Sequence, residues 1–404
     1  MKQKDLSLIR EGSIKFYIHN IDINSIPSKS MNVFYNKRME INRDITNLSI
    51  NAYKELYQQK DLVVIDSMAA SGISAIRILN ECGEVKKLYI NDINPEAVRL
   101  IKLNLRINNL DKETNRYCIT NKDANFLFSE IASKSSEKQK KPNIISIDPF
   151  GTPNRYIDPA FKAIQKDNGL MCITATDTAV LFGVRPKACI RKYLSKPLHS
   201  EYCKELGGRI LISFISRIAN INNMGITPLL TFYSGHFIRL FCLTFKNKKE
   251  ISKFFEKLGY LIHCSNCGYR STFKNILLIP KKCPVCDVEE DLDFAGPMWI
   301  DRLHDEYFLK NIINLNSNLI YPNQKKIDKL LNYAVEENKM PISYYNVHNL
   351  CQNLKLKSVP KIKVIINEIR NLGYRASRTH FDFLSIKTDI NLPTIKNILV
   401  KLQN

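Results

Sequence analysis

Short apolar runs alternate with amphipathic stretches from about residue 62 onward. The apolar runs predict five buried strands: LVVID (62–66), KKLYIND (86–92), RYCIT (116–120), IISID (144–148) and GLMCITAT (169–176). Between the first three runs, SGISAIRILNEC and NPEAVRLIKLNLRINN have apolar residues at helical spacing, with Pro95 in an expected first turn. This alternation predicts a parallel sheet with helices on both faces.

The pattern changes after the fifth predicted strand. A helical stretch around residues 199–221 is followed by ITPLLTFY and HFIRLFCLTF, which are separated only by Ser234 and Gly235. Two strands joined by so short a turn must run antiparallel. Five parallel strands closed by a hairpin resemble the sheet of the class I methyltransferases. We therefore expect residues 1–247 to form an α/β, doubly wound catalytic domain with an antiparallel last strand.

A charged break, KNKKE (246–250), predicts a domain boundary. Residues 248–404 are expected to form a C-terminal α+β domain with a cysteine-bearing insert (264–286) and a mostly helical tail. In that tail, YYNVHNLCQNL and SVPKIKVIINEIRNLGYRAS predict two helices and a short strand, and HFDFLSIKTD predicts a returning strand. This order favours a winged-helix module about as strongly as a plain helical support domain.

Four of the eleven cysteines form a regularly spaced cluster. Cys264 and Cys267 make one CxxC pair, and Cys283 and Cys286 make a second pair after fifteen intervening residues. This spacing predicts a tetrathiolate zinc site. Four thiolates leave no position for water on the metal, so the zinc is expected to be structural. Disulfides and an iron–sulfur cluster are the alternatives.

Net charge narrows the class of partner. Lys and Arg number 60 against 39 Asp and Glu, which gives a formal net charge of +21. A field of this sign favours polyanions, meaning nucleic acid or an anionic membrane face, and a generally lysine-rich proteome is the alternative explanation. No apolar run approaches the roughly 20 residues of a membrane helix, and the N-terminus lacks the apolar core of a signal peptide. We expect a cytoplasmic protein with no membrane attachment and no obligate protein partner.

Acidic residues follow the predicted strands, at the edge of the sheet where doubly wound proteins bind ligands. Asp66, Asp92 and Asp148 close three strands, and Asp123 follows a fourth. Asp92 closes the second strand, a position from which a carboxylate accepts hydrogen bonds from both hydroxyls of a ribose. The first turn, DSMAASGIS, has only one glycine. It therefore suits a ligand without a phosphate there, such as S-adenosylmethionine, although an ordinary capped helix start is the alternative.

The stretch IDPFGTP (147–153) places a carboxylate and an aromatic ring directly after the fourth strand. Asp148-Pro149-Phe150-Gly151 resembles the acidic-Pro-Pro-aromatic motif of amino methyltransferases. The exocyclic amine of a base is a poor nucleophile because its lone pair is delocalised. A carboxylate that accepts its N–H bonds localises that pair and takes the proton as the methyl arrives. An aromatic face beside it stacks on an extruded base or attracts a sulfonium cation.

Six sequence blocks in order carry a more specific resemblance. They are VFYNKRMEINRD (33–44), DSMAASGISAIR (66–77), YINDINPEAV (89–98), KDANFLF (122–128), IDPFGTP (147–153) and TATDTAVLFGVRPKACIRKYLSKPL (174–198). Together they are similar to the tRNA (guanine-26, N2)-dimethyltransferase family over roughly residues 10–245. The likeness returns at GYRASRTHF (373–381).

The resemblance implies that one or two methyl groups pass from S-adenosylmethionine to N2 of a guanine in tRNA. On the matching positions it implies five cofactor-binding residues: Arg43, Arg77, Asp92, Asp123 and Ala124. Asp66 joins them because it ends the first strand. Asp148 is implied to be the catalytic carboxylate, with Phe34 and Phe150 flanking the guanine or the methionine end of the cofactor. Surface arginines and a core phenylalanine are the plain alternatives for Arg43, Arg77 and Phe34.

Two other functions stay open at this stage. One is an amino methyltransferase that acts on another RNA or DNA base. The other is a non-catalytic RNA-binding protein that keeps the sheet as a scaffold. The pairing of Asp148 with Phe150 beside a full set of cofactor positions argues against the second.

Overall fold

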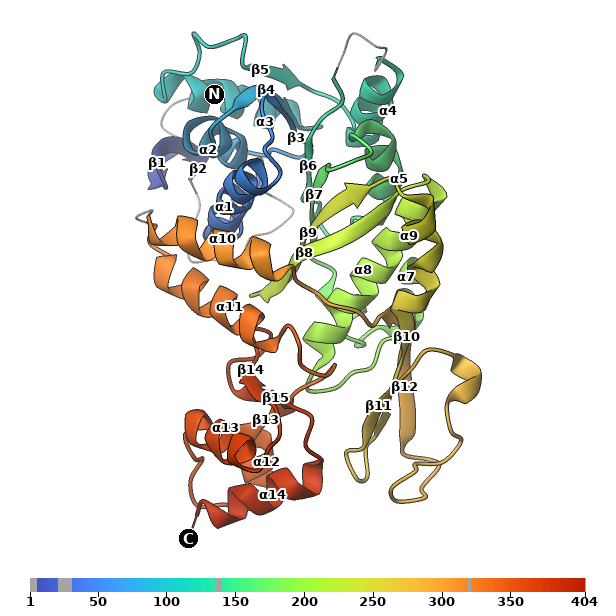
Figure 1. Cartoon of the computed structure of the whole chain (residues 1–404). Coiled ribbons are helices and arrows are strands. Elements are labelled where there is room, and N and C mark those ends of the chain that lie inside the picture. The colour runs from blue at the N-terminus through green and yellow to red at the C-terminus, as the bar shows by residue number, and fades with distance from the viewer. Residues whose placement is uncertain (1–5, 21–30, 135–139, 319–320, 404) are drawn as a thin grey trace.

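A seven-stranded sheet forms the centre of the computed structural model, which describes residues 6–20, 31–134, 140–318 and 321–403 (Figure 1). Its strand order is β5-β4-β3-β6-β7-β9-β8. The strands are β3 (Leu62–Asp66), β4 (Val85–Asn91), β5 (Tyr117–Thr120), β6 (Ile144–Ile147), β7 (Leu170–Ala175), β8 (Gly225–Ser234) and β9 (Phe237–Phe245). Neighbours from β5 to β7 pair in parallel, whereas β9 runs antiparallel to both β7 and β8. The predicted class I methyltransferase sheet is confirmed.

Helices cover both faces of this sheet, as the alternating pattern predicts. They are α1 (Glu40–Leu56), α2 (Ile73–Glu81), α3 (Pro95–Ile107), α4 (Ala124–Lys134), α5 (Asn154–Ala163), α6 (Thr178–Leu181), α7 (Pro186–Tyr193) and α8 (Cys203–Ile221). The helices α1 to α3 share one hydrophobic core, and α4, α5 and α8 share the other. Adjacent residues of β3 serve different cores, because Val64 lies in the first and Ile65 in the second.

An N-terminal hairpin, which the sequence pattern did not reveal, precedes the sheet. It consists of β1 (Leu6–Glu11) and β2 (Ile14–His19). Asn104 of α3 holds it in place, since its amide accepts from Tyr17 N and donates to the carbonyl oxygens of Tyr17 and Ser71. The hairpin thereby brings Glu11 into the interior, where it is 3% exposed.

The C-terminal half holds two further three-stranded sheets, ordered β11-β10-β12 and β13-β15-β14. Its elements are α9 (Lys248–Ser252), β10 (Leu258–Cys264), β11 (Arg270–Phe273), β12 (Leu292–Trp299), α10 (Glu306–Ser317), α11 (Gln324–Glu337), β13 (Tyr345–Asn346), α12 (Val347–Asn353), α13 (Ile362–Asn371), β14 (Ala376–Arg378), β15 (Ser385–Thr388) and α14 (Leu392–Lys401). The order α12, α13, β14, β15 matches the predicted pair of helices with two antiparallel strands. It favours the winged-helix module over a plain helical support domain.

The C-terminal elements do not all pack as a separate body. Figure 1 shows α10 lying against α1, and both α10 and α11 contribute buried residues to the core of the catalytic sheet. The strands β10 and β12 pack in the same core as α8. Residues 345–402 form a core of their own. The division at residues 247 and 248 therefore remains a prediction.

In the described part of the chain, no helix combines the length and the apolar character needed to cross a lipid bilayer.

A buried ion cluster joins the N-terminal hairpin to the helices α1 and α2. The guanidinium of Arg77 is fully buried and pairs with Glu11 at 2.9 Å, Asp44 at 2.7 Å and Glu81 at 2.9 Å. From the segment between α10 and α11, the Tyr321 hydroxyl donates to Glu81 at 2.8 Å. One arginine thus pairs with three carboxylates, so its loss would leave uncompensated buried charge.

We predict that Arg77→Met lowers the free energy of unfolding by about 3–5 kcal/mol, because breaking a buried pair from one side strands its partners. Urea denaturation followed by circular dichroism measures the change. Arg99→Met is the matched control, since Arg99 pairs with Glu96 on the surface and its loss should leave stability nearly unchanged. Equal stability of the two variants would contradict a structural role for the cluster.

Candidate functional site

Three carboxylates meet at the ends of adjacent strands. Asp66 ends β3, Asp92 follows β4 and Asp148 follows β6, and these strands are neighbours in the sheet. Burial, together with the negative charges of Asp148 and Asp92, raises the pKa of Asp66 to about 7. Burial also raises the pKa of Asp92 and of Asp148. Like charges crowded in this way favour a ligand that carries positive charge.

Asp66 offers this ligand an unused acceptor. The residue is 4% exposed, and its Oδ2 atom has no hydrogen-bond partner among the described residues. A buried polar atom without a partner is rare in folded proteins and marks a place where a ligand group fits. The structure thus supports the expectation that a cation-bearing cofactor lies at the end of β3.

Asp92 joins the first turn to the end of the second strand. Its Oδ2 accepts from the backbone N–H of Ala70 at 2.7 Å and its Oδ1 from that of Asn94 at 2.8 Å. The turn that it meets is tight, because Ala70 and Gly72 both have positive φ. Such a turn lets the backbone approach a ligand closely, next to a carboxylate suited to a ribose.

Ala124 begins α4 and Asp123 directly precedes it, after β5, which lies one strand further from the centre of the sheet than β4. The Asp123 Oδ1 atom accepts from Asn125 N at 2.8 Å, and Ala124 is buried. The Asn91 amide bridges the carbonyls of Ser67 and Lys122 at 3.0 and 2.9 Å, so the loops after β3, β4 and β5 are held together. Asp123 therefore lies beside Asp92, on the side away from Asp148.

The two predicted aromatic residues contact each other. The rings of Phe34 and Phe150 lie edge to face, with centroids 4.6 Å apart and planes at 84°. Phe150 is 51% exposed, so a large apolar surface faces solvent directly after Asp148. The Gly151 N–H donates to the Thr176 hydroxyl at 2.6 Å, which fixes the turn that carries Phe150. The structure thus brings together residues more than a hundred positions apart.

Asp148 is half-buried and has a cationic group behind it. Burial raises its pKa, whereas the charge of Arg239, a hydrogen bond with the Thr174 hydroxyl and the charge of Arg43 lower it. Arg239 Nη1 donates to the same Thr174 hydroxyl at 2.7 Å. Thr174 therefore connects the arginine to the carboxylate.

Arg239 is a further residue of the candidate site, and the sequence reasoning missed it. It is 1% exposed and makes no ion pair within 4 Å among the described residues. Its other guanidinium nitrogen donates to the hydroxyls of Thr46 and Ser146. The signal was present in HFIRLFCLTF, where one arginine interrupts an otherwise apolar strand. A buried cation without a paired carboxylate compensates the charges nearest to it, which here include Asp148 and Asp66.

His236 was also missed, because a histidine in a hairpin turn gives no signal by itself. Its Nε2 lies 3.2 Å from the side-chain nitrogen of Asn36, which belongs to the segment that carries Phe34. Burial and the charge of Arg38 lower its pKa, so the ring is neutral near pH 7. The contact joins the tip of the last hairpin to the aromatic pair.

The two predicted arginines share one carboxylate. Arg43 pairs with Glu11 through two hydrogen bonds of 2.6 Å, while Arg77 pairs with the same Glu11 from the core. The charge of Arg43 reaches Asp148. The described contacts of Arg77 go to acids of the chain and to the ring of Tyr321, so the structure does not place it with the strand-end residues. Direct contact of Arg77 with a cofactor remains a prediction.

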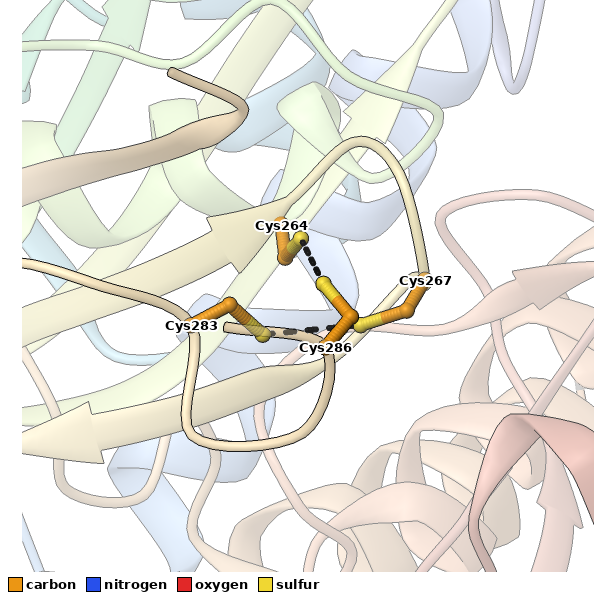
Figure 2. A group of neighbouring side chains, drawn as sticks. All are labelled: Cys264, Cys267, Cys283 and Cys286. Atoms are coloured by element: carbon orange, nitrogen blue, oxygen red, sulfur yellow. Dashed lines mark hydrogen bonds between the residues drawn. The ribbon is translucent and has the colours of Figure 1, made fainter. Parts of the chain in front are cut away.

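The four cysteines of the insert converge at one point, away from the strand ends. Figure 2 shows Cys264 facing Cys286 and Cys267 facing Cys283, with sulfur–sulfur distances of 3.6 and 3.5 Å. All four sulfurs lie within 4.8 Å of one another. A tetrahedral zinc with Zn–S bonds near 2.3 Å requires sulfurs about 3.8 Å apart, so the arrangement fits this metal. The sulfurs are too far apart for the disulfide alternative.

Known proteins resemble the chain over its whole length. The family model described as N2,N2-dimethylguanosine tRNA methyltransferase matches residues 12–400. A protein of Methanosphaera stadtmanae named tRNA (guanine(26)-N(2))-dimethyltransferase is 34% identical, over 99% of this chain and 98% of its own. A protein of the same name from Methanobrevibacter smithii is 33% identical over 100% of both chains.

A solved structure agrees with these relatives. It is described as the complex of Trm1 from Pyrococcus horikoshii with S-adenosyl-L-methionine, and it has a TM-score of 0.79 at 30% identity, covering 98% of this chain and 100% of its own. The sheet with its antiparallel last strand, the acidic strand ends and the family match agree, and the chain belongs to the N2,N2-dimethylguanosine tRNA methyltransferase family.

Proposed function

We propose that this protein transfers one or two methyl groups from S-adenosylmethionine to N2 of a guanine in tRNA, at position 26 as in the names of its relatives. The observation that supports this most is the half-buried Asp148 next to the edge-to-face pair of Phe34 and Phe150. A carboxylate that suits an amine and an exposed ring that suits a base, Phe150, occur together after the end of β6. Family membership favours guanine in tRNA over the other bases that such a pair would suit.

The residues at the strand ends fit the cofactor. S-adenosylmethionine, when bound, supplies an electrophilic methyl group on a cationic sulfur. Asp66 has the unused acceptor for a positively charged group, and Asp92 would hold the ribose. Asp123 and Ala124 would line the side beyond Asp92. Arg43 would offer its charge to the cofactor's carboxylate, while Arg77 acts through Glu11, which both arginines share.

The protein's own groups then prepare the amine. Asp148 accepts the N–H bonds of the guanine amino group, which localises the nitrogen lone pair, and it takes up the proton that the amine loses. Arg239, through Thr174, favours the ionised form of Asp148 in a site where burial opposes it. Phe34 and Phe150 hold the extruded base by stacking. This mechanism needs no covalent intermediate with the enzyme.

The charge of the chain agrees with an RNA substrate. A net charge of +21 gives a sequence-independent attraction to phosphates. Arg185, Lys187 and Arg191 are exposed in and just before α7, shortly after β7 ends at the same edge of the sheet as Asp148. A cytoplasmic location remains the expectation for such an enzyme.

We predict that Asp148→Asn lowers kcat for tRNA methylation by at least about 100-fold, because an amide cannot take up the proton. The affinity for S-adenosylmethionine should stay within a few-fold. Incorporation of labelled methyl groups into unmodified tRNA measures the first quantity, and calorimetric titration the second. Asp111→Asn, on an exposed turn, is the control and should behave as the wild type. Normal turnover of Asp148→Asn would refute the assigned role.

A second prediction concerns Arg239 and pH. The charge of Arg239 lowers the pKa of Asp148, so Arg239→Gln should raise it. Because only the ionised carboxylate acts, the fall in kcat at low pH should then begin at a higher pH than in the wild type. The pH profile of kcat tests this, with thermal melting recorded in parallel. An unshifted profile in a folded variant would show that Arg239 is only structural.

We also propose that Cys264, Cys267, Cys283 and Cys286 hold one structural zinc. It would fasten the connections around β10, β11 and β12, a small sheet with few buried residues at its far end. Because four thiolates complete the coordination, the metal takes no part in methyl transfer.

We predict about one zinc per chain by metal analysis. Cys267→Ser should lose the metal and melt at a lower temperature, while its kcat stays within a few-fold of the wild type. Cys118→Ser, a half-buried cysteine outside the cluster, should keep the metal. Purified protein without zinc, or with iron in its place, would overturn this assignment.

A further inference from the structure

A cavity of about 370 Å³ lies apart from both sites described above. Its walls come from Arg209 of α8, from residues 300–304 between β12 and α10, from residues 337–342 at the end of α11, and from Arg375 and Lys387 next to and within the β13-β15-β14 sheet. Figure 1 shows the link from β12 to α10 passing beside α8, with the end of α11 close to β14. The cavity thus lies where the catalytic sheet and the last module meet.

The charged groups in its floor compensate one another. Lys387 Nζ lies 2.8 Å from Glu205 and 3.4 Å from Glu337. Arg209 pairs with the same Glu205 at 2.9 Å. Glu337 also accepts from the His380 ring. These contacts explain how the floor folds without a ligand. Besides the Nε2 atom of His380, they leave two polar groups of the cavity lining without partners.

Those two groups are Asn338 and His304. Asn338 is 9% exposed, and neither its side-chain oxygen nor its nitrogen has a hydrogen-bond partner among the described residues. His304 is 3% exposed, and its Nδ1 accepts from the backbone N–H of Thr231 at 3.3 Å. Burial keeps the ring neutral, so its proton lies on Nε2, which is without a partner. Both residues line the cavity, and each carries a buried N–H donor that no described group accepts.

The rim adds positive charge to these donors. Arg302 is exposed and makes no ion pair within 4 Å in the described chain. Lys339 has only an exposed pair with Glu306 at 3.9 Å, and Arg375 pairs with Asp389 on the surface. Exposed pairs of this kind open at little cost. Unused N–H donors on lining residues, together with cations at the rim, suit a phosphate.

A metal ion would not fit the same place. His304, Glu337 and His380 do lie within 4.8 Å of one another. The unpartnered nitrogen of His304 carries a proton, however, and Lys387 already holds a positive charge beside Glu337. Both features oppose a cation.

The sheet register relates this cavity to Asp148. His304 is hydrogen-bonded to Thr231 of β8, and β8 is separated from β6 by β9 and β7. Three strand-to-strand spacings of about 4.8 Å place the His304 side of the cavity roughly 15 Å from β6, the strand that Asp148 follows. Thr231 pairs with Leu240, next to Arg239, so both places lie at the same level along the strands. A polynucleotide spans such a distance, whereas a single nucleotide does not.

We propose that this cavity binds a backbone phosphate of the substrate tRNA and so holds the RNA while a guanine lies at Asp148. This inference rests on the proposed function for its ligand, and it assigns to Asn338, His304 and Arg302 a part in tRNA binding alone.

Two variants test it. Asn338→Leu removes a donor without changing charge, and Arg302→Ala removes a rim cation. Each should raise KM for tRNA at least fivefold, while kcat and the affinity for S-adenosylmethionine stay within twofold. Arg302→Ala should also reduce the slope of log affinity against log salt by about one, whereas Asn338→Leu should leave it unchanged. Lys326→Ala, an exposed cation of α11 outside the cavity, is the control for lost charge.

Thermal melting separates binding from folding. Asn338→Leu should melt no lower than the wild type, because it removes two unpaired buried polar atoms. A lower melting temperature, or a KM equal to that of Lys326→Ala, would overturn the proposal. If inorganic phosphate stabilises the wild type but not the variants, and KM for tRNA is unchanged, the cavity takes a free anion and the RNA assignment is wrong. A wild-type protein that methylates no tRNA would instead refute the proposed function.

Discussion

Burial of Asp66, Asp92 and Asp148 at the ends of three adjacent strands disfavours the ionised form of each carboxylate. The other groups of the site offset this free-energy cost. Arg239 contributes a buried positive charge from β9, and Thr174 passes it to Asp148 by hydrogen bonds. The antiparallel last strand is what makes this possible, because β9 pairs directly with β7 and places Arg239 opposite Thr174. The topology of the sheet and the protonation state of Asp148 are thus connected through one arginine.

A second set of charges holds the N-terminal hairpin and the segment before α11 against the helices of the catalytic sheet. Glu11 of the hairpin joins Arg43 to Arg77, and Arg77 in turn pairs with Asp44 and Glu81. The segment before α11 reaches the same cluster, since Tyr321 donates to Glu81 and Asn323 donates to Asp44. The segment between the C-terminal helices α10 and α11 therefore supports this ion cluster, while the helices themselves enlarge the core.

Local sequence patterns predicted the fold well for elements whose own residues determine their secondary structure. LVVID coincides with β3, and the adjacent runs ITPLLTFY and HFIRLFCLTF form the expected antiparallel pair. The hairpin β1–β2 was missed because its burial depends on α3, through contacts such as those of Asn104. The domain division was less readable, since α10 and α11 have amphipathic patterns that do not reveal which core they join.

In the candidate site, too, local sequence predicted some residues, whereas others depend on contacts between distant segments. Asp66, Asp92 and Asp148 follow strands, so their convergence could be predicted from topology alone. Phe34 and Phe150 were assigned to one site only through the family resemblance, because the residues around a lone phenylalanine do not indicate which side chain it contacts. Arg239 lies opposite Thr174, which only the register of β9 shows, and the contact of His236 with Asn36 depends on how two distant segments pack. The cavity at Asn338 depends on five separate segments, and no sequence pattern predicts it.

The account claims above all that Asp148 serves an exocyclic amine. Incubating the protein with unmodified tRNA and labelled S-adenosylmethionine, then locating the label by nucleoside mass spectrometry, tests this most directly. The account predicts label on N2 of a guanine, at position 26. Label confined to a ring nitrogen, a ribose hydroxyl or another base would contradict it.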